Sequence, residues 1–272
     1  MKGETLGGPE ESGGRVLAGH TNGSAGSASC VASASKQESG QFTSPMRDAR
    51  SPEVEGASAS SSYTRMLWAA VALVVLYTIL DGVAQVLPPH YSPISQAESD
   101  LAVGPYGYIM AINFLNRGVI SLTFVYGFAG TLGQTPGGLG RYKGGLALLG
   151  VWGTCAFLLA VFPTDVPSTP LSWHGAIHLA VALVAFVAGA LGTLWISLRG
   201  SSDPALLGAR TSVLPISVAG VISLLLLFGT LTGAIGGLIE RVFIGSVLLW
   251  IVAMSIYLTR AANSKAGHLF RD

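Results

Sequence analysis

The residues best suited to chemistry lie in one stretch, Phe162–His178, which reads FPTDVPSTPLSWHGAIH. Asp165 belongs to a proline-rich connection, and His174 and His178 follow at i, i+4 spacing in the first turns of an apolar helix. Two histidines on one helix face can bind a single zinc ion, and a carboxylate can supply a third, oxygen ligand. Zinc is therefore a candidate cofactor. The alternative is that both histidines hydrogen-bond to Asp165, Tyr91 or the backbone.

The same side chains suggest how a hydrolase could work. Asp165, His174 and His178 would hold zinc, while Asp81 or a serine would assist a water molecule. Three serines of the first connection lie near the same surface: Ser92, Ser95 and Ser99. None of them is marked by a nucleophile elbow, so they are read as loop serines. Whether the protein is an enzyme stays open, and a non-enzymatic role is favoured. The candidate catalytic residues are Asp165, His174, His178 and Asp81.

A second group of polar residues surrounds Arg117. Its predicted helix places it roughly 16 Å deep, near the middle of the bilayer. An arginine there costs at least about 2.5–3.5 kcal/mol, so it needs a partner, and Asp81 and Glu240 are the candidates. Either such an ion pair locks the helices together, or Arg117 belongs to a site for an anionic or polar ligand. The candidate ligand-binding residues are Arg117, Asn113, Asn116, Glu240 and Tyr91.

Long apolar helices must position these side chains. Only 11% of the 272 residues are charged, against about 25% in soluble domains, and the apolar runs reach the ~20 residues that cross a bilayer. The fold class is therefore all-α: a polytopic membrane protein built as a bundle of six transmembrane helices. Ser172 is the expected N-cap of the fourth helix. The predicted helices cover residues 66–86, 106–129, 144–162, 173–198, 212–232 and 238–258.

The segments outside these helices are polar. Residues 1–62 are rich in Ser, Gly and Ala, a composition typical of a disordered tail, although translation could instead begin at Met46. The six-helix domain is expected to cover 63–262, and residues 263–272 form a short tail. The first connection, PPHYSPISQAESDLAVGPYG, is too polar to cross a membrane and is expected to be a surface segment with at most a short helix.

Charge and cysteine usage limit the partners and the location. The net charge of +1 without a basic stripe predicts no nucleic-acid partner, so the lipid bilayer is the expected environment. Cys30 and Cys155 provide no disulfide framework. Lys and Arg gather in the loops on one side of six alternating helices. The positive-inside rule therefore predicts a bacterial plasma-membrane protein with both termini in the cytoplasm.

Three stretches together resemble a known family: YSPISQAESDL at Tyr91–Leu101 with the following PYGYIMAINFLNRG, FPTD at Phe162–Asp165, and HGAIH at His174–His178. They are similar to a bacterial and archaeal family of six-helix membrane proteins catalogued as a domain of unknown function. The resemblance covers about Leu67–Leu258 and implies a six-helix bundle with a shared polar cluster on its outer side.

A looser similarity runs to the membrane-embedded hydrolases that include alkaline ceramidases. Those proteins use intramembrane His, Asp and Ser residues around zinc. They have seven spans with an HxxxH on the last one, whereas this chain has six with HxxxH on the fourth.

Three functions remain open from the sequence. The favoured interpretation is a membrane protein with an outward-facing polar pocket that binds or senses a polar small molecule or lipid head group, or that serves a partner protein. The alternative is a metal-dependent, ceramidase-like lipid hydrolase. The third is a small transporter, although neither an inverted repeat of three and three helices nor a mid-membrane Gly/Pro break is evident.

Overall fold

The computed structural model describes residues 52–133, 138–166, 168–203, 206–230 and 233–269, with side chains described within 61–264 of these ranges except at residue 230. They belong to one compact unit, Ala49–Asp272. Most of the predicted disordered tail, residues 1–62, lies outside the described residues, as do Cys30 and Met46.

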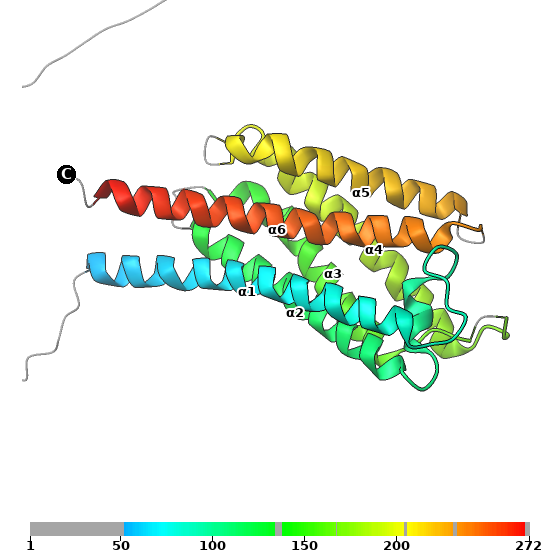
Figure 1. The fold of residues 1–272 in the computed structure, drawn as a ribbon. Helices are drawn as coiled ribbons and strands as arrows, with labels where there is room; N and C mark the ends of the chain where they lie inside the picture. Colours follow the sequence, from blue (N-terminus) through cyan, green and yellow to red (C-terminus); the bar gives the residue numbers. More distant parts are fainter. Residues whose placement is uncertain (1–51, 134–137, 167, 204–205, 231–232, 270–272) are drawn as a thin grey trace, which may run out of the picture. The chain divides into compact units, whose positions relative to one another are not determined.

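Six long helices make up the fold (Figure 1). All six are long and apolar enough to cross a membrane, and no strand occurs among the described residues, which confirms the predicted all-α, six-helix fold class. Short 3-10 turns, η1 (Glu98–Ala102), η2 (Gly140–Tyr142) and η3 (Leu207–Ala209), precede three of the helices. The long helices are α1 (Pro52–Val86), α2 (Gly107–Gly133), α3 (Lys143–Val161), α4 (Trp173–Gly200), α5 (Arg210–Thr230) and α6 (Gly236–Leu269).

Two of these helices are longer than their apolar runs. Helix α1 begins at Pro52, within the predicted tail, and α6 continues to Leu269, beyond its predicted end at residue 258. Hydropathy marks only the part of a helix that is apolar. Polar residues that continue the same helix beyond its apolar run are therefore not detected by hydropathy.

Successive helices pack against one another, and α6 also packs against α1. Small residues allow the closest approaches. A Cβ added to Gly189 of α4 would lie 3.0 Å from the Trp152 ring of α3, and one added to Gly153 would lie 2.7 Å from the Cβ of Ser121 on α2. These contacts bring α2, α3 and α4 together around a core that includes the fully buried Trp152 and Phe124.

Because the six helices alternate in direction, the α1–α2, α3–α4 and α5–α6 connections lie at the same end of the bundle. We call this the η1 end; in Figure 1 it lies at the right. The opposite end holds Arg141 in η2, Arg199 in the last turn of α4, and Arg210 at the start of α5. Every candidate site residue named from the sequence lies in the half of the bundle near the η1 end.

The α1–α2 connection lies mostly at the surface and contains a short helix, η1, as predicted, but the middle of the connection turns inward. Its η1 turn folds into the bundle, where the Glu98 and Leu101 side chains are each only 2% exposed. Helix α6 holds this connection in place: the Leu238 N–H donates to the Ile94 carbonyl at 2.9 Å. Gly237 lies so close to the Gln96 backbone that a Cβ there would overlap it. The prediction missed this inward turn because polarity along the chain does not show whether buried partners satisfy the polar groups.

Candidate functional site

Four buried side chains from four elements meet near the η1 end. Tyr77 of α1 donates a short hydrogen bond to Oε1 of Glu98 in η1. Arg117 of α2 places Nη1 3.9 Å from Oε2 of the same carboxylate. The Glu98 backbone N–H donates to Oε2 of Glu240 on α6 at 3.0 Å. We call Tyr77, Glu98, Arg117 and Glu240 the Glu98 cluster. Because each member comes from a different element, the cluster forms only when α1, η1, α2 and α6 are packed together.

Arg117 is incompletely satisfied in this cluster. Its side chain is buried, and its Nε has no hydrogen-bond partner among the described residues. Its guanidinium carbon lies 4.9 Å from the Phe114 ring centroid and 5.8 Å from that of Trp152, so aromatic faces supply part of its environment. A guanidinium has five N–H donors, and buried donors without acceptors are costly. Arg117 therefore keeps donors for water or a ligand.

The observed partner of Arg117 corrects the prediction. Asp81 and Glu240 were the expected partners, but the ion pair is with Glu98. Asp81 accepts a hydrogen bond from Gln85 at 2.5 Å, one turn along α1, and its carboxyl also lies against that of Glu98. The sequence offered one weak sign of a buried Glu98. Ala97 and Leu101 are apolar residues at i, i+4 spacing on either side of it, as in a turn that packs on one face.

The two asparagines of α2 bind the backbone of α1. The amide nitrogen of Asn113 donates to the Tyr77 carbonyl at 3.3 Å, and that of Asn116 donates to the Leu73 carbonyl at 3.0 Å. Both side chains are buried. They were predicted as ligand-binding residues; their amide nitrogens bind the α1 backbone, Oδ1 of Asn113 has no hydrogen-bond partner among the described residues, and neither side chain lines the two hollows described below.

Tyr91 and Arg241 hold the connection against α6. The Tyr91 hydroxyl donates to the Ala97 carbonyl at 2.8 Å, and Nη2 of Arg241 donates to the Tyr91 oxygen. Nη1 of Arg241 donates to the carbonyls of Pro93 and Gln96, each at 3.0 Å. Burial raises the pKa of the Tyr91 hydroxyl, so it remains a protonated donor at neutral pH. Together these contacts fix the backbone that carries Glu98.

Asp165 stabilises the start of α4. Its carboxylate accepts hydrogen bonds from the Ser172 backbone N–H at 2.8 Å and from the Ser172 hydroxyl at 2.5 Å. The Ser172 hydroxyl in turn accepts from the Gly175 N–H at 3.1 Å, which confirms the predicted N-cap. Hydrogen bonds from Ser172 hold the pKa of the Asp165 carboxyl below its usual value.

The two histidines of α4 have different surroundings. His178 is buried, and its Nδ1 lies 2.7 Å from the Phe162 carbonyl. Because a carbonyl can only accept, Nδ1 carries a proton and Nε2 remains for another partner. His174 is only partly buried and lies against Trp173, with ring centroids 3.4 Å apart and the ring planes tilted by 58°.

These residues do not fit the predicted zinc site in this arrangement. Within the described ranges, no group of three or more His, Cys, Asp or Glu side chains is placed to hold a metal ion. Asp165 directs both carboxylate oxygens at Ser172, and His178 directs Nδ1 at a backbone carbonyl. The donor set of Asp165, His174 and His178 is thus engaged in helix capping and in local packing.

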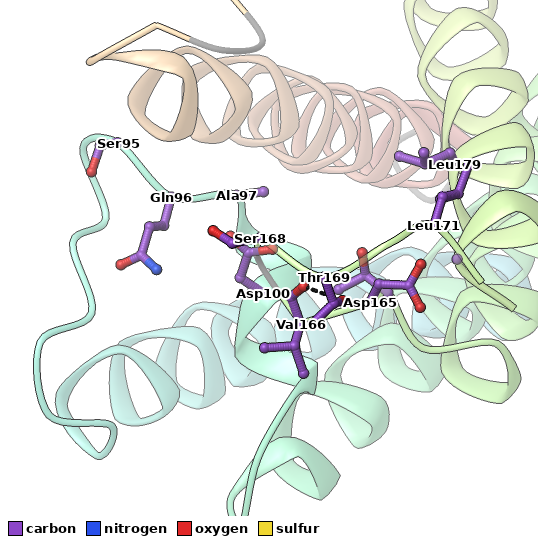
Figure 2. A pocket seen from close by; sticks show the side chains of 12 residues that line it. Ser95, Gln96, Ala97, Asp100, Asp165, Val166, Ser168, Thr169, Leu171 and Leu179 are labelled. Carbon is purple, nitrogen blue, oxygen red and sulfur yellow. Dashed lines mark hydrogen bonds between the residues drawn. The ribbon is translucent and has the colours of Figure 1, made fainter.

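Two hollows lie at the η1 end. The larger, which we call the loop pocket, has a volume of about 460 Å³. Figure 2 shows Ser95 and Gln96 at one side of it and Leu171 and Leu179 at the other, with Asp100, Asp165 and Thr169 between them. Burial raises the pKa of the Asp100 carboxyl in this pocket.

The smaller hollow, which we call the inner cavity, has a volume of about 110 Å³ and is lined by two members of the Glu98 cluster, Arg117 and Glu240. Its polar lining comes from Arg117, Glu240, His178 and Ser99. Ala97 and Leu179 line both hollows, so the loop pocket and the inner cavity are neighbours. The apolar lining of the inner cavity consists of Ala97, Phe114, Leu159, Leu179, Ala182, Phe186 and Leu227.

The sequence model of the family described as Protein of unknown function (DUF998) matches residues 69–257. The chain belongs to the DUF998 family. The match begins in α1 and ends in α6, so it includes all four members of the Glu98 cluster and every residue that lines the two hollows. The predicted membership in a six-helix family of unknown function is thereby confirmed. Neither a curated protein nor a solved structure matches the chain.

Proposed function

We propose that this DUF998 protein binds a polar small molecule or a lipid head group in the inner cavity, with Arg117 as the main anchoring residue. The observation that carries the proposal is a buried guanidinium, only 1% exposed, that lines a cavity and has an Nε without a partner among the described residues. A ligand acceptor there would remove an energetic cost that the folded protein otherwise bears.

The geometry favours a ligand site over a purely structural lock. A hydrogen-bonded arginine–carboxylate pair has a separation of about 2.7–2.9 Å, but Arg117 and Glu98 are 3.9 Å apart. The space beside them is also larger than a locking contact requires. A volume of about 110 Å³ exceeds the ~10–15 Å³ that one water molecule needs. The pair therefore has room for the polar group of a ligand.

The proposed orientation places both termini in the cytoplasm of a bacterial cell and the inner cavity toward the outside. Arg141, Arg199 and Arg210 lie at the end of the bundle opposite η1, which supports this orientation through the positive-inside rule. The ligand would then reach the cavity from the extracytoplasmic side of the plasma membrane. The hydrolase and transporter interpretations have no comparable supporting observation.

Native mass spectrometry of the detergent-purified protein tests the proposal. The wild type is expected to carry a co-purified small molecule or lipid, or to acquire one from a bacterial lipid and metabolite extract. Arg117→Met should lose it. Arg199→Met is the matched control, because Arg199 is an exposed arginine that stacks on Trp195 at 5.4 Å at the opposite end. Equal ligand occupancy in both variants, or no bound molecule in the extract-treated wild type, would overturn the proposal.

A further inference from the structure

We infer that the inner cavity selects a zwitterion, a compact group with an oxyanion and an ammonium a few atoms apart, attached to an apolar remainder. This inference rests on the proposed function and specifies its ligand. It follows from three properties of the cavity: charges of both signs in its lining, hydrogen-bonding groups that suit both halves of a zwitterion, and an apolar wall that continues toward the loop pocket.

The charges exclude a simple anion or cation as the best ligand. Arg117 and Glu240 both line the cavity, and the Glu98 carboxylate lies 3.9 Å from the Arg117 guanidinium. A ligand with only negative charge would meet two carboxylates besides the guanidinium. A ligand with only positive charge would meet the guanidinium. A zwitterion can direct its oxyanion to Arg117 and its ammonium to Glu240, so each charge has an opposite partner.

The hydrogen-bonding groups complete this match. The unpartnered Nε of Arg117 suits an oxyanion, since a guanidinium can donate two parallel hydrogen bonds to a carboxylate or phosphate. Glu240 receives the Glu98 N–H at Oε2, so Oε1 remains for an ammonium. His178 uses Nδ1 for the Phe162 carbonyl and can offer Nε2 as an acceptor. The Ser99 hydroxyl also lines the cavity.

The position of the cavity suits a ligand with an apolar part. His178 is five residues from the start of α4 and Glu240 is four from the start of α6, which places them about 6–8 Å along these helices from the η1 end. Leu179 lines both hollows and is exposed, as is Leu171 in the loop pocket. An apolar chain could follow this route toward lipid while the zwitterion lies against Arg117.

Two sources could supply such a group: a free amino acid with an apolar side chain, or an aminophospholipid. Titration calorimetry with the full-length protein in detergent separates them. One probe series compares L-leucine with two singly charged analogues. The first is 4-methylpentanoate, which lacks the ammonium, and the second is isoamylamine, which lacks the carboxylate. The other is dihexanoyl phosphatidylethanolamine against the anionic dihexanoyl phosphatidylglycerol. In at least one series the zwitterion should bind at least tenfold more tightly than its singly charged analogues.

Three variants link this binding to the cavity. Arg117→Met should abolish binding of the zwitterion, and Arg199→Met should leave it unchanged. Ala182→Leu adds volume to the cavity wall and removes no charge, so it should weaken binding at least tenfold even if Arg117→Met does not fold.

The outcomes separate this inference from the proposed function. If an anionic probe binds as tightly as its zwitterionic relative and still requires Arg117, the proposed function stands and the zwitterion inference is overturned. If a zwitterion binds equally well to Ala182→Leu, the inner cavity is not its site and the inference again fails. If no probe binds the wild type, the zwitterion inference fails while the mass-spectrometric test decides the proposed function.

Discussion

Removal of the Tyr77 hydroxyl should destabilise the bundle measurably. Tyr77→Phe keeps the aromatic ring, which is only 4% exposed, and deletes the donor that reaches Oε1 of Glu98. The carboxylate would then retain the Arg117 contact at 3.9 Å and weaker electrostatic interactions with Asp81 and Arg241. The substitution therefore tests whether the Glu98 carboxylate is held inside the bundle.

The size of the effect follows from the type of hydrogen bond. A hydrogen bond to a charged group contributes about 1.5–3 kcal/mol in soluble proteins. Interhelical hydrogen bonds in a membrane protein average about 0.6 kcal/mol and reach about 1.7. Since Glu98 is buried and has few other partners, we expect about 1.5 kcal/mol, near the upper membrane value. At about 2–4 °C per kcal/mol for a domain of this size, the Tm should fall by about 3–6 °C.

Cys155 provides the assay. It is a free, buried thiol, so a maleimide dye that fluoresces on reaction reports the temperature at which the bundle opens. A Cys30→Ser background leaves Cys155 as the single thiol in the chain, which has two cysteines. Tyr126→Phe is the matched control, because that ring is 59% exposed on α2 and the same hydroxyl is removed. The control should unfold at nearly the same temperature as the background protein, because an exposed hydroxyl contributes little to stability.

A double-mutant cycle identifies the partner of the hydroxyl. In a Glu98→Ala background, Tyr77→Phe should have almost no further effect, because the acceptor is already gone. If Tyr77→Phe leaves the Tm of the background protein unchanged, the Glu98 carboxylate is not held by Tyr77. If the loss is the same with and without Glu98, the hydroxyl acts on another group. Either result would refute the described cluster.

Three further predictions concern the segments that surround the site. A lowered pKa in the folded state gives Asp165 a stabilising effect that is present above its ordinary pKa, about 3.9, and is lost as the pH falls through the lowered value. Asp165→Asn should therefore lower the Tm at pH 7, and the difference from wild type should shrink on acidification; a constant difference would contradict the capping role. Arg241→Lys should lower the Tm and speed proteolysis of the α1–α2 connection, because a lysine ammonium cannot reproduce the guanidinium contacts with Tyr91 and two carbonyls. An unchanged rate of proteolysis would show that other contacts hold the connection. Gly237→Ala should destabilise the folded protein by about 1–3 kcal/mol, since the new Cβ would overlap the Gln96 backbone. Gly245→Ala is the control and should be tolerated, because a Cβ there meets nothing within 4 Å. Equal Tm values for the two variants would refute the close approach of Gly237 to Gln96.

The sequence could identify Arg117 but not its partner. A charged residue among apolar ones in a membrane helix is conspicuous because burying it is costly. Its partner, Glu98, lies in a polar connection, where an acid is ordinary and gives no such signal. Asn113 and Asn116 illustrate the same difficulty. Their types predicted polar contacts at the right depth, yet whether they face a ligand or the α1 backbone depends on how α1 packs beside α2.

The histidine pair shows why spacing alone did not define a metal site. His174 and His178 share one helix face, as i, i+4 residues must. The environment of each is set by different neighbours: the Trp173 ring lies against the first, and the Phe162 carbonyl contacts the second. Asp165 is near in sequence, but the backbone turn before α4 directs its carboxylate at Ser172. The two candidate metal ligands on α4 are therefore not joined by Asp165 as a third.

By itself the sequence determined the number of helices, the all-α membrane class and the cap at Ser172. These depend on local properties, namely the length of apolar runs and the preference of serine for a helix start. Only the tertiary structure decided that η1 turns inward, that Glu98 meets Arg117 and Glu240, and that a cavity remains beside them. Those contacts join residues as far apart as 142 positions in the chain. Their existence depends on the packing of all the elements at once, which no local pattern of residues specifies.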